Sequence, residues 1–361
     1  MNLADLWKRS RTGVLAVAMA LVVGILLLLV AGANPFEALG VIIDGSLGST
    51  ARFGDTLMVW APLVLAAAGL LITFAAGLWN IGVEGQIVFG AIAASLVARE
   101  VSGPTWLIVT LALLAGFVGG GFWAFLAGLL RTYGKVNEIF GGLGLFFVAQ
   151  ALAVYLVLGP WKRPGVASTS GTEPFPRESW LPTLGSTRLS WVAVLVAVIA
   201  VLVVFYLLRG TRFGLRLKAV GKNMRSAFLL GIPTGRYMLA AFALGGGLAG
   251  LAGAVQATGF HHKLVPSISG GYGFLAILVA MLAGYAARWI APIAFVFAML
   301  AVGSTLLPLK LGLDSSVGGV LQGVLVLFTI LAQGWQARRQ DRSDGMAVGP
   351  PETPIVPGEV G

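Results

Sequence analysis

The sequence predicts an all-α polytopic membrane protein with about ten transmembrane helices, some of them broken or re-entrant. Of the 361 residues, 58% are hydrophobic and only 11% are charged, and the mean hydropathy is +0.92. A soluble domain carries roughly 25% charged residues. Apolar runs of about twenty residues, the length that crosses the hydrocarbon of a bilayer, recur along the chain. A soluble fold of this size could not bury so much apolar surface, so we expect a membrane bundle.

The apolar runs divide the chain into a short polar start (1–12), a transmembrane domain (13–336) and a polar, proline-rich tail (337–361) that we expect to be disordered. The first apolar run, 13–32, is too long for a typical signal peptide and lacks a small-x-small cleavage site, so it is expected to be a helix. An external loop, with room for a half-buried helix, is expected at 34–50. The helices expected after it are about 55–78, a helix ending near 98, 104–130, 136–158, 190–208, 237–258, 272–285, 289–307 and 317–335.

Two polar intervals set the expected orientation. With ten crossings and both termini cytoplasmic, 159–189 is an external loop and 209–236 a cytoplasmic one. Sixteen Lys and Arg residues then lie inside and eight outside, which is the bias that orients membrane proteins. The segment 272–285 is short for a full span, so it is expected either to cross or to form half of a re-entrant pair.

The loop 209–236 carries seven Lys and Arg residues and no acid. Its centre predicts one short helix, with Asn223 as N-cap, Gly231 as the left-handed stop and Pro233 preventing continuation. A solvated loop that obeys the charge rule would also fit this composition. The alternative is a contact surface for a soluble partner.

A polar break at 80–86 interrupts the membrane domain. Asn80, Glu84 and Gln86 stand there between apolar segments, where an ionised carboxylate is costly unless it is paired or solvated. A helix cap or a turn in water would satisfy Glu84 equally well. The stretches 77–94 and 267–284 both place a glycine-rich break before a short apolar helix, and such paired interruptions often mark a binding site near the midplane.

Other polar and aromatic residues have simpler interpretations. Asn137 and Glu138 are expected to cap the helix that follows. Phe146 and Phe147 could stack on a base but are more typical of packing. Gln150, Gln256 and Gln322 either bridge helices or line a path. Glycines at Gly116/Gly120 and at Gly246/Gly250/Gly253 predict close helix contact.

The sequence contains no signature of an enzyme or of a metal or cofactor site. It has no G-x-x-x-x-G-K-[ST] motif for ATP, no Ser/His/Asp, H-E-x-x-H or paired-carboxylate arrangement, and no cysteine. Its two histidines, His261 and His262, are neighbours that point apart on any regular element. The basic residues fall in short loops, so the net charge of +10 does not indicate a nucleic-acid partner.

Four motifs resemble those of one transporter family. The run G-T-x-F-G-L-R-x-K-A-V-G-x-N-x-x-x-A-x-x-x-G-I, from Gly210 to Ile232, resembles the coupling loop of bacterial ABC-transporter permeases for ribose-type sugars, nucleosides and branched-chain amino acids. G-L-x-N-I-G-x-E-G-Q at 77–86, V-N-E-I at 136–139 and G-P-W-K at 159–162 are similar to the nucleoside-type members. The sequence departs from them at Phe146-Phe147, where Asn-Tyr is frequent, which weakens any assignment of the substrate.

The resemblance implies a permease subunit of an ATP-driven importer of nucleosides or simple sugars, in the bacterial inner membrane. It implies a separate ABC ATPase, a second permease subunit as a heterodimer partner, an extracytoplasmic solute-binding protein and a lipid surround. The expected substrate-pathway residues are Asn80, Glu84, Gln86, Phe146, Phe147 and Gln150. The expected ATPase-coupling residues are Ala219, Gly221, Asn223, Ala227 and Gly231.

Two alternatives remain open at the level of sequence. A proton-coupled secondary transporter would use Glu84 as its titrating group and would work without an ATPase. A structural or channel-like bundle would allow passive flux and would not need the short helix in the basic loop.

Overall fold

A computed structural model describes residues 22–23, 25–26, 28–30, 32–165, 170–185, 187–314, 316–324, 327 and 331. Only parts of the expected first helix (13–32) and last helix (317–335) lie within the described residues, and the tail 337–361 lies wholly outside them. The chain forms two units, Met1–Ala38 with Ser316–Gly361, and Leu39–Ser315. In the first unit the described residues 317–324 are helical. The helices discussed below belong to the second unit, apart from the start of α2 (Pro35–Leu47).

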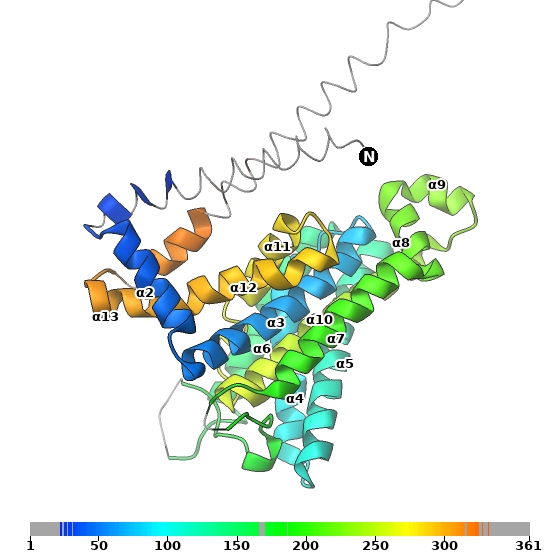
Figure 1. Cartoon of the computed structure of the whole chain (residues 1–361). Coiled ribbons are helices and arrows are strands. Elements are labelled where there is room, and N and C mark those ends of the chain that lie inside the picture. Colours follow the sequence, from blue (N-terminus) through cyan, green and yellow to red (C-terminus); the bar gives the residue numbers. More distant parts are fainter. Residues whose placement is uncertain are drawn as a thin grey trace, which may run out of the picture. The chain divides into compact units, whose positions relative to one another are not determined.

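The described part of the second unit is helical, with a single isolated bridge between Thr183 and Ser190 (Figure 1). Its helices after α2 are α3 (Thr50–Ala75), α4 (Val83–Glu100), α5 (Thr105–Thr132), α6 (Glu138–Leu158), α7 (Trp191–Gly210), α8 (Arg212–Lys222), α9 (Met224–Leu229), α10 (Thr234–Val255), α11 (Tyr272–Leu282), α12 (Ala287–Gly303) and α13 (Leu307–Leu311). A π-helix, Gln256–His261, extends α10, and short 3-10 turns lie at Arg177–Ser179 and Ser304–Leu306.

Six of the described segments are long and apolar enough to cross a membrane. They are Thr50–Ala75, Thr105–Thr132, Glu138–Leu158, Trp191–Gly210, Thr234–His261 and Ala287–Leu311. The multi-pass prediction is confirmed, but ten crossings are not. Two of the four remaining expected spans, 13–32 and 317–335, lie partly outside the described residues. The other two are α4, which carries a polar first turn, and α11, which has only 11 residues and lies below the length of a span.

Helix α3 forms the centre of the bundle. Every residue from Met58 to Thr73 is buried, as expected for a helix that is apolar on all sides. Helices α7, α10, α11 and α12 all pack against it, and α7 and α10 run beside it in Figure 1.

Close glycine contacts join α5 to α10. A Cβ atom added at Gly120 would lie 2.5 Å from the Cα of Gly250, and one added at Gly116 would lie 3.0 Å from the Gly250 carbonyl oxygen. Gly253 lies directly against the backbone of Ile87 on α4. The prediction of close helix contact through these glycines is confirmed, and the contact lies within this chain.

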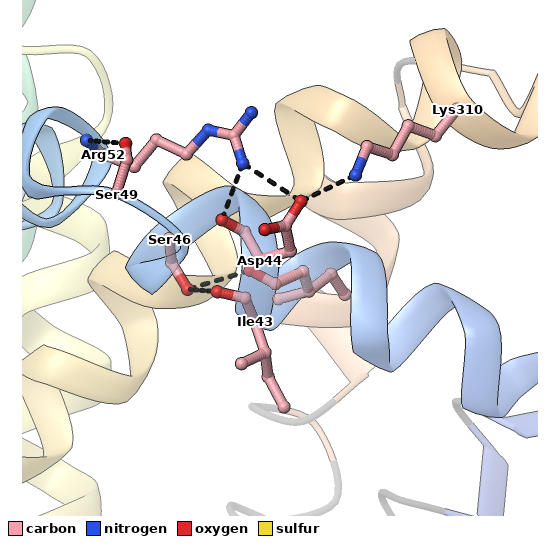
Figure 2. Close-up of polar contacts among 7 residues, drawn as sticks. Ile43, Asp44, Ser46, Ser49, Arg52 and Lys310 are labelled. Atoms are coloured by element: carbon pink, nitrogen blue, oxygen red, sulfur yellow. Dashed lines mark hydrogen bonds and ion pairs between the residues drawn. The ribbon is translucent and has the colours of Figure 1, made fainter.

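A charged cluster ties α2 to α3 and α13 (Figure 2). One carboxylate oxygen of Asp44 lies 3.0 Å from Arg52 Nη1 and 2.6 Å from Lys310 Nζ. The hydrogen bond from Lys310 lowers the pKa of the Asp44 carboxyl below its ordinary value, and Arg52 adds to the effect. Arg52 and Lys310 were both expected on the outer side, and they do lie at the same end of the bundle.

Candidate functional site

The polar break before α4 is closed by two amides. Asn80 Nδ2 donates to Gln86 Oε1 at 2.9 Å, and Gln86 Nε2 donates to Asn80 Oδ1 at 2.8 Å. Both side chains are buried, with exposed fractions of 2% and 1%. The two amides therefore satisfy each other and close the turn that joins α3 to α4.

Glu84, in the first turn of α4, caps a different helix. Its Oε1 accepts the Gly271 N–H at 3.0 Å, and its Oε2 accepts the Gly273 N–H at 2.6 Å. The Ser269 hydroxyl also interacts with this carboxylate. A carboxylate bound by main-chain N–H groups at a helix N-terminus is stabilised both by charged hydrogen bonds and by the helix dipole. This arrangement explains how Glu84 is tolerated while almost fully buried.

Gly273 makes the close approach of the two helices possible. A Cβ atom at Gly273 would lie 2.8 Å from both the Cα and the N of Glu84. Gly271, two residues earlier at the N-cap of α11, has a φ of 79°, which other residues adopt only with strain. The repeated glycine-rich breaks therefore meet in space: the second break supplies the N–H groups, and the first supplies the carboxylate.

Helix α6 completes this junction of α4 and α11. Gln150 Nε2 donates to the Pro266 carbonyl at 2.6 Å and so holds the backbone that leads into α11. The Phe146 ring meets Phe274 edge-on at 6.0 Å, and its backbone lies close to Gly85. Phe147 is 61% exposed. Of the expected pathway residues, Glu84 and Gln150 therefore hold this junction, Asn80 and Gln86 close the turn before it, and Phe147 faces outward.

Gln256 lies at the start of the π-helix, and its polar atoms are not saturated. It is 1% exposed, lies beside the Tyr272 hydroxyl, and makes no other side-chain hydrogen bond within the described residues. The buried amide therefore keeps spare hydrogen-bonding capacity next to the helix junction. In the sequence, Gln256 stands out as a polar residue inside an apolar run. Gln150 does so too, and it bridges to the Pro266 carbonyl, so the sequence alone could not distinguish the two roles.

The geometry of Glu84 does not favour the proton-coupled alternative. Both of its oxygens are used by the backbone of α11, so protonation would weaken the cap that holds this helix. Among the described residues, no three His, Asp or Glu side chains come close enough to bind a metal ion together.

The short helix in the basic loop forms as predicted. The side chain of Asn223 accepts the Ser226 N–H at 2.9 Å, α9 follows, and Gly231 has a φ of 78°. Helix α8, which was not predicted, precedes it and is capped by Thr211, whose Oγ1 accepts the Gly214 N–H at 3.0 Å. The two helices form one segment, Arg212–Leu229, which we call the coupling segment.

Of the expected coupling residues, Gly221, Asn223 and Gly231 are exposed, whereas the two alanines are covered. Asn223 and Gly231 bound α9, Ala219 is half-buried, and Ala227 is only 2% exposed. A Cβ atom at Gly221 would lie 2.8 Å from the Gly77 nitrogen, so α8 rests on the end of α3.

The end of α9 exposes three large apolar side chains. Phe228, Leu229 and Leu230 are 67%, 77% and 80% exposed. Sequence reasoning missed these residues, although three consecutive large apolar side chains outside any span were visible. Large apolar side chains that remain exposed together often mark a contact with another protein.

The described part of the loop 159–189 packs against the opposite end of α10. The Trp180 ring stacks on His262 with a centroid distance of 3.8 Å and an interplanar angle of 10°. The Thr172 N–H donates to the Leu264 carbonyl, and the Phe175 N–H to the His262 carbonyl, both at 2.8 Å. Burial lowers the pKa of His262, although its contact with the Thr258 carbonyl partly offsets this.

Comparisons with known proteins agree with these features. Residues 53–330 match the family model described as "Branched-chain amino acid transport system / permease component". A glucose ABC transporter permease protein of Haloferax volcanii is 33% identical over 343 residues, which cover 92% of this chain and 90% of the relative. A guanosine ABC transporter permease protein of Bacillus subtilis is 26% identical, covering 87% and 91%. A nucleoside ABC transporter permease protein of Lactococcus lactis is 26% identical, covering 80% and 82%. The chain therefore belongs to the family of branched-chain amino acid transport system permease components.

Proposed function

We propose that this chain is the membrane-spanning permease subunit of an ATP-driven importer of nucleosides or simple sugars. The observation that carries the proposal is α9, a capped helix in a loop without acids that presents Phe228, Leu229 and Leu230 to solvent. The family membership and the names of the relatives, which refer to glucose, guanosine and nucleosides, support the same class.

In this proposal a separate ATPase binds the apolar surface of α9. The chain has no ATP-binding motif of its own, so the energy must come from a partner. Closure of the ATPase would displace α9 and α8 together. Since α8 touches the end of α3 at Gly221 and Gly77, the displacement would reach the buried centre of the bundle. The two states of the bundle then differ in how they bind the ATP-loaded partner.

The solute pathway is proposed to run beside the junction of α4, α6 and α11. Gln256 supplies the polar contact, and the exposed Phe147 faces a second permease subunit or the pathway between the two. The loop 159–189, held on His262 through Trp180, is proposed to receive the solute-binding protein at the outer end. The N-terminus, the coupling segment and the tail are then on the cytoplasmic side.

The test is uptake by proteoliposomes that contain the chain with its neighbouring permease, ATPase and solute-binding protein. Labelled guanosine, adenosine, uridine, ribose and glucose would each be offered with and without ATP. Leu229→Asp places a charge on the exposed surface of α9. Leu184→Asp is the matched control for ATPase binding only, because Leu184 is 58% exposed at the opposite end but lies in the loop proposed to receive the solute-binding protein. Ala227→Arg is less suitable, because Ala227 is buried and its replacement would disturb α9 itself.

We expect ATP-dependent uptake that Leu229→Asp abolishes, together with loss of ATPase co-purification, while the control keeps the ATPase bound. Uptake that persists without ATP and ignores Leu229→Asp would overturn the proposal. Uptake restricted to one solute class would assign the substrate.

A further inference from the structure

A cavity of about 370 Å³ opens at the end of the bundle that carries the coupling segment. Its walls come from the last turns of α3 and α7, from Lys218 on α8, and from the turn between α11 and α12. A cavity of this size can admit a small charged group.

The rim of the cavity carries three cations and no acid. These are Arg209, Lys218 and Arg288, and no ion pair joins any of them to a carboxylate within the described residues. Lys218 Nζ donates to the Leu208 carbonyl at 2.6 Å and keeps its other donors. The guanidinium of Arg209 lies 5.2 Å from the Phe205 ring, and that of Arg288 lies 5.7 Å from the Trp289 ring. Neither guanidinium donates a hydrogen bond to another described residue, so their donors remain available.

The inner wall of the cavity is apolar. Leu71 and Phe74 from α3 and Phe205 and Leu208 from α7 form it, and Phe74 meets Tyr285 edge-on at 5.4 Å. The cavity therefore offers apolar contact toward the bundle and positive charge at its mouth. A free inorganic anion would use only the mouth.

The position of the cavity relative to the spans fits an amphipathic ligand. The cavity is lined by the last turns of the candidate spans Thr50–Ala75 and Trp191–Gly210 and by the first turn of the candidate span Ala287–Leu311. The ends of spans lie at the boundary of the hydrocarbon, which is the depth of phospholipid phosphates. Basic pockets between membrane helices at this depth suit anionic lipid head groups.

We propose that this cavity binds the phosphate group of an anionic phospholipid. Arg209, Lys218 and Arg288 hold the phosphate, and the wall formed by Leu71, Phe74 and Phe205 contacts the glycerol and the upper acyl chain. Since Lys218 lies on α8 and Arg288 on α12, one phosphate would link the coupling segment to the bundle. A soluble phosphate ester shares the charged part of this chemistry but lacks the apolar part.

The test measures lipid binding to the purified full-length chain by native mass spectrometry during titration in detergent. The probes are phosphatidylglycerol, phosphatidylcholine, inorganic phosphate and glycerol 1-phosphate. The variant is Arg209→Gln with Arg288→Gln, two exposed side chains whose loss removes no hydrogen bond between described residues. The matched control is Arg212→Gln with Arg225→Gln. It removes the same amount of charge from exposed positions of the loop 209–236 that do not line the cavity.

We expect phosphatidylglycerol to bind in preference to phosphatidylcholine, and the cavity variant to weaken this binding by about tenfold or more. The control should change it by less than about threefold. Three results would overturn the proposal: equal weakening by the control, equal binding of the two lipids, or saturation by inorganic phosphate or glycerol 1-phosphate at the concentrations at which the lipid binds. None of these measurements requires an ATPase or a solute, so they are independent of the transport proposal.

Discussion

The carboxylate of Glu84 lies 2.6 Å from the main-chain N–H of Gly273, 189 residues further along the chain. The contact joins the first turn of α4 to the first turn of α11. Glu84, which resembles a titrating site in the sequence, therefore acts as a helix cap. The stability of the junction should therefore depend on the acceptor oxygens of Glu84.

Replacing Glu84 should destabilise the fold in a graded way. Glu84→Gln keeps one acceptor oxygen and loses the charge, whereas Glu84→Ala loses both acceptors and leaves two N–H groups buried. We expect a loss of about 1–2 kcal/mol for the first and about 2–4 kcal/mol for the second, measured by thermal unfolding in detergent. A Glu84→Gln variant of normal stability that becomes insensitive to a proton gradient would contradict the capping role.

Adding a methyl group at Gly273 should separate α11 from α4. The added carbon would lie 2.8 Å from the Glu84 backbone, so Gly273→Ala should cost about 1–3 kcal/mol of stability. Gly144→Ala in α6 is the control, because a Cβ atom there would meet nothing within 4 Å. The control should be neutral or slightly stabilising, as expected for alanine in a helix. Equal melting temperatures for the two variants would show that the junction has more room than the structure gives.

Gly221→Ala should lower transport without lowering ATPase binding. The added methyl would press on Gly77 at the end of α3 while leaving the exposed surface of α9 intact. We expect the ATPase to co-purify normally and ATP-driven uptake to fall by about tenfold. The measurement is the ratio of solute transported to ATP hydrolysed in proteoliposomes. An unchanged ratio would mean that α8 does not transmit the motion.

Replacing Gln86 with Leu should lower stability, whereas replacing Gln256 with Leu should lower uptake. Gln86→Leu would leave both polar ends of Asn80 without a partner and should cost about 1–3 kcal/mol of stability. Gln256→Leu removes an amide that has only Tyr272 beside it, so stability should change by less than about 1 kcal/mol. Uptake by this variant should nevertheless fall, measured as an increase in the solute concentration for half-maximal rate. Normal uptake would exclude Gln256 from the pathway.

Acidification should weaken the packing of the loop 159–189 through His262. Burial lowers its pKa in the folded protein below that of the unfolded chain, so its contribution to stability is present above the unfolded value of about 6.5. That contribution is lost as the pH falls from there through the folded pKa, because protons bind the unfolded chain first. His262→Phe keeps a ring against Trp180 and should flatten the decline in melting temperature between pH 7 and pH 5. If the decline in melting temperature is the same in the variant, groups other than His262 cause it.

Local patterns predicted the helices and the capped helix of the basic loop. The observed α5 (Thr105–Thr132) and α6 (Glu138–Leu158) lie within two residues of their expected bounds, because each span is an apolar run of fixed length between polar ends. Asn223 and Gly231 could be assigned from sequence since caps act on neighbouring backbone. The ten expected crossings are not confirmed, because two of the expected spans lie partly outside the described residues and hydropathy alone does not separate a full span from a half-span such as α11.

The sequence by itself therefore determined that this is a multi-pass helical membrane protein with a capped helix in a basic loop. Only the tertiary structure decided which side chains hold the junction, which surface of α9 is open, and where three cations meet around a cavity. Glu84 binds N–H groups 187 and 189 residues away, and Gln150 binds a carbonyl 116 residues away. Such pairings depend on how the helices pack together, which no local period, length or cap in the sequence records.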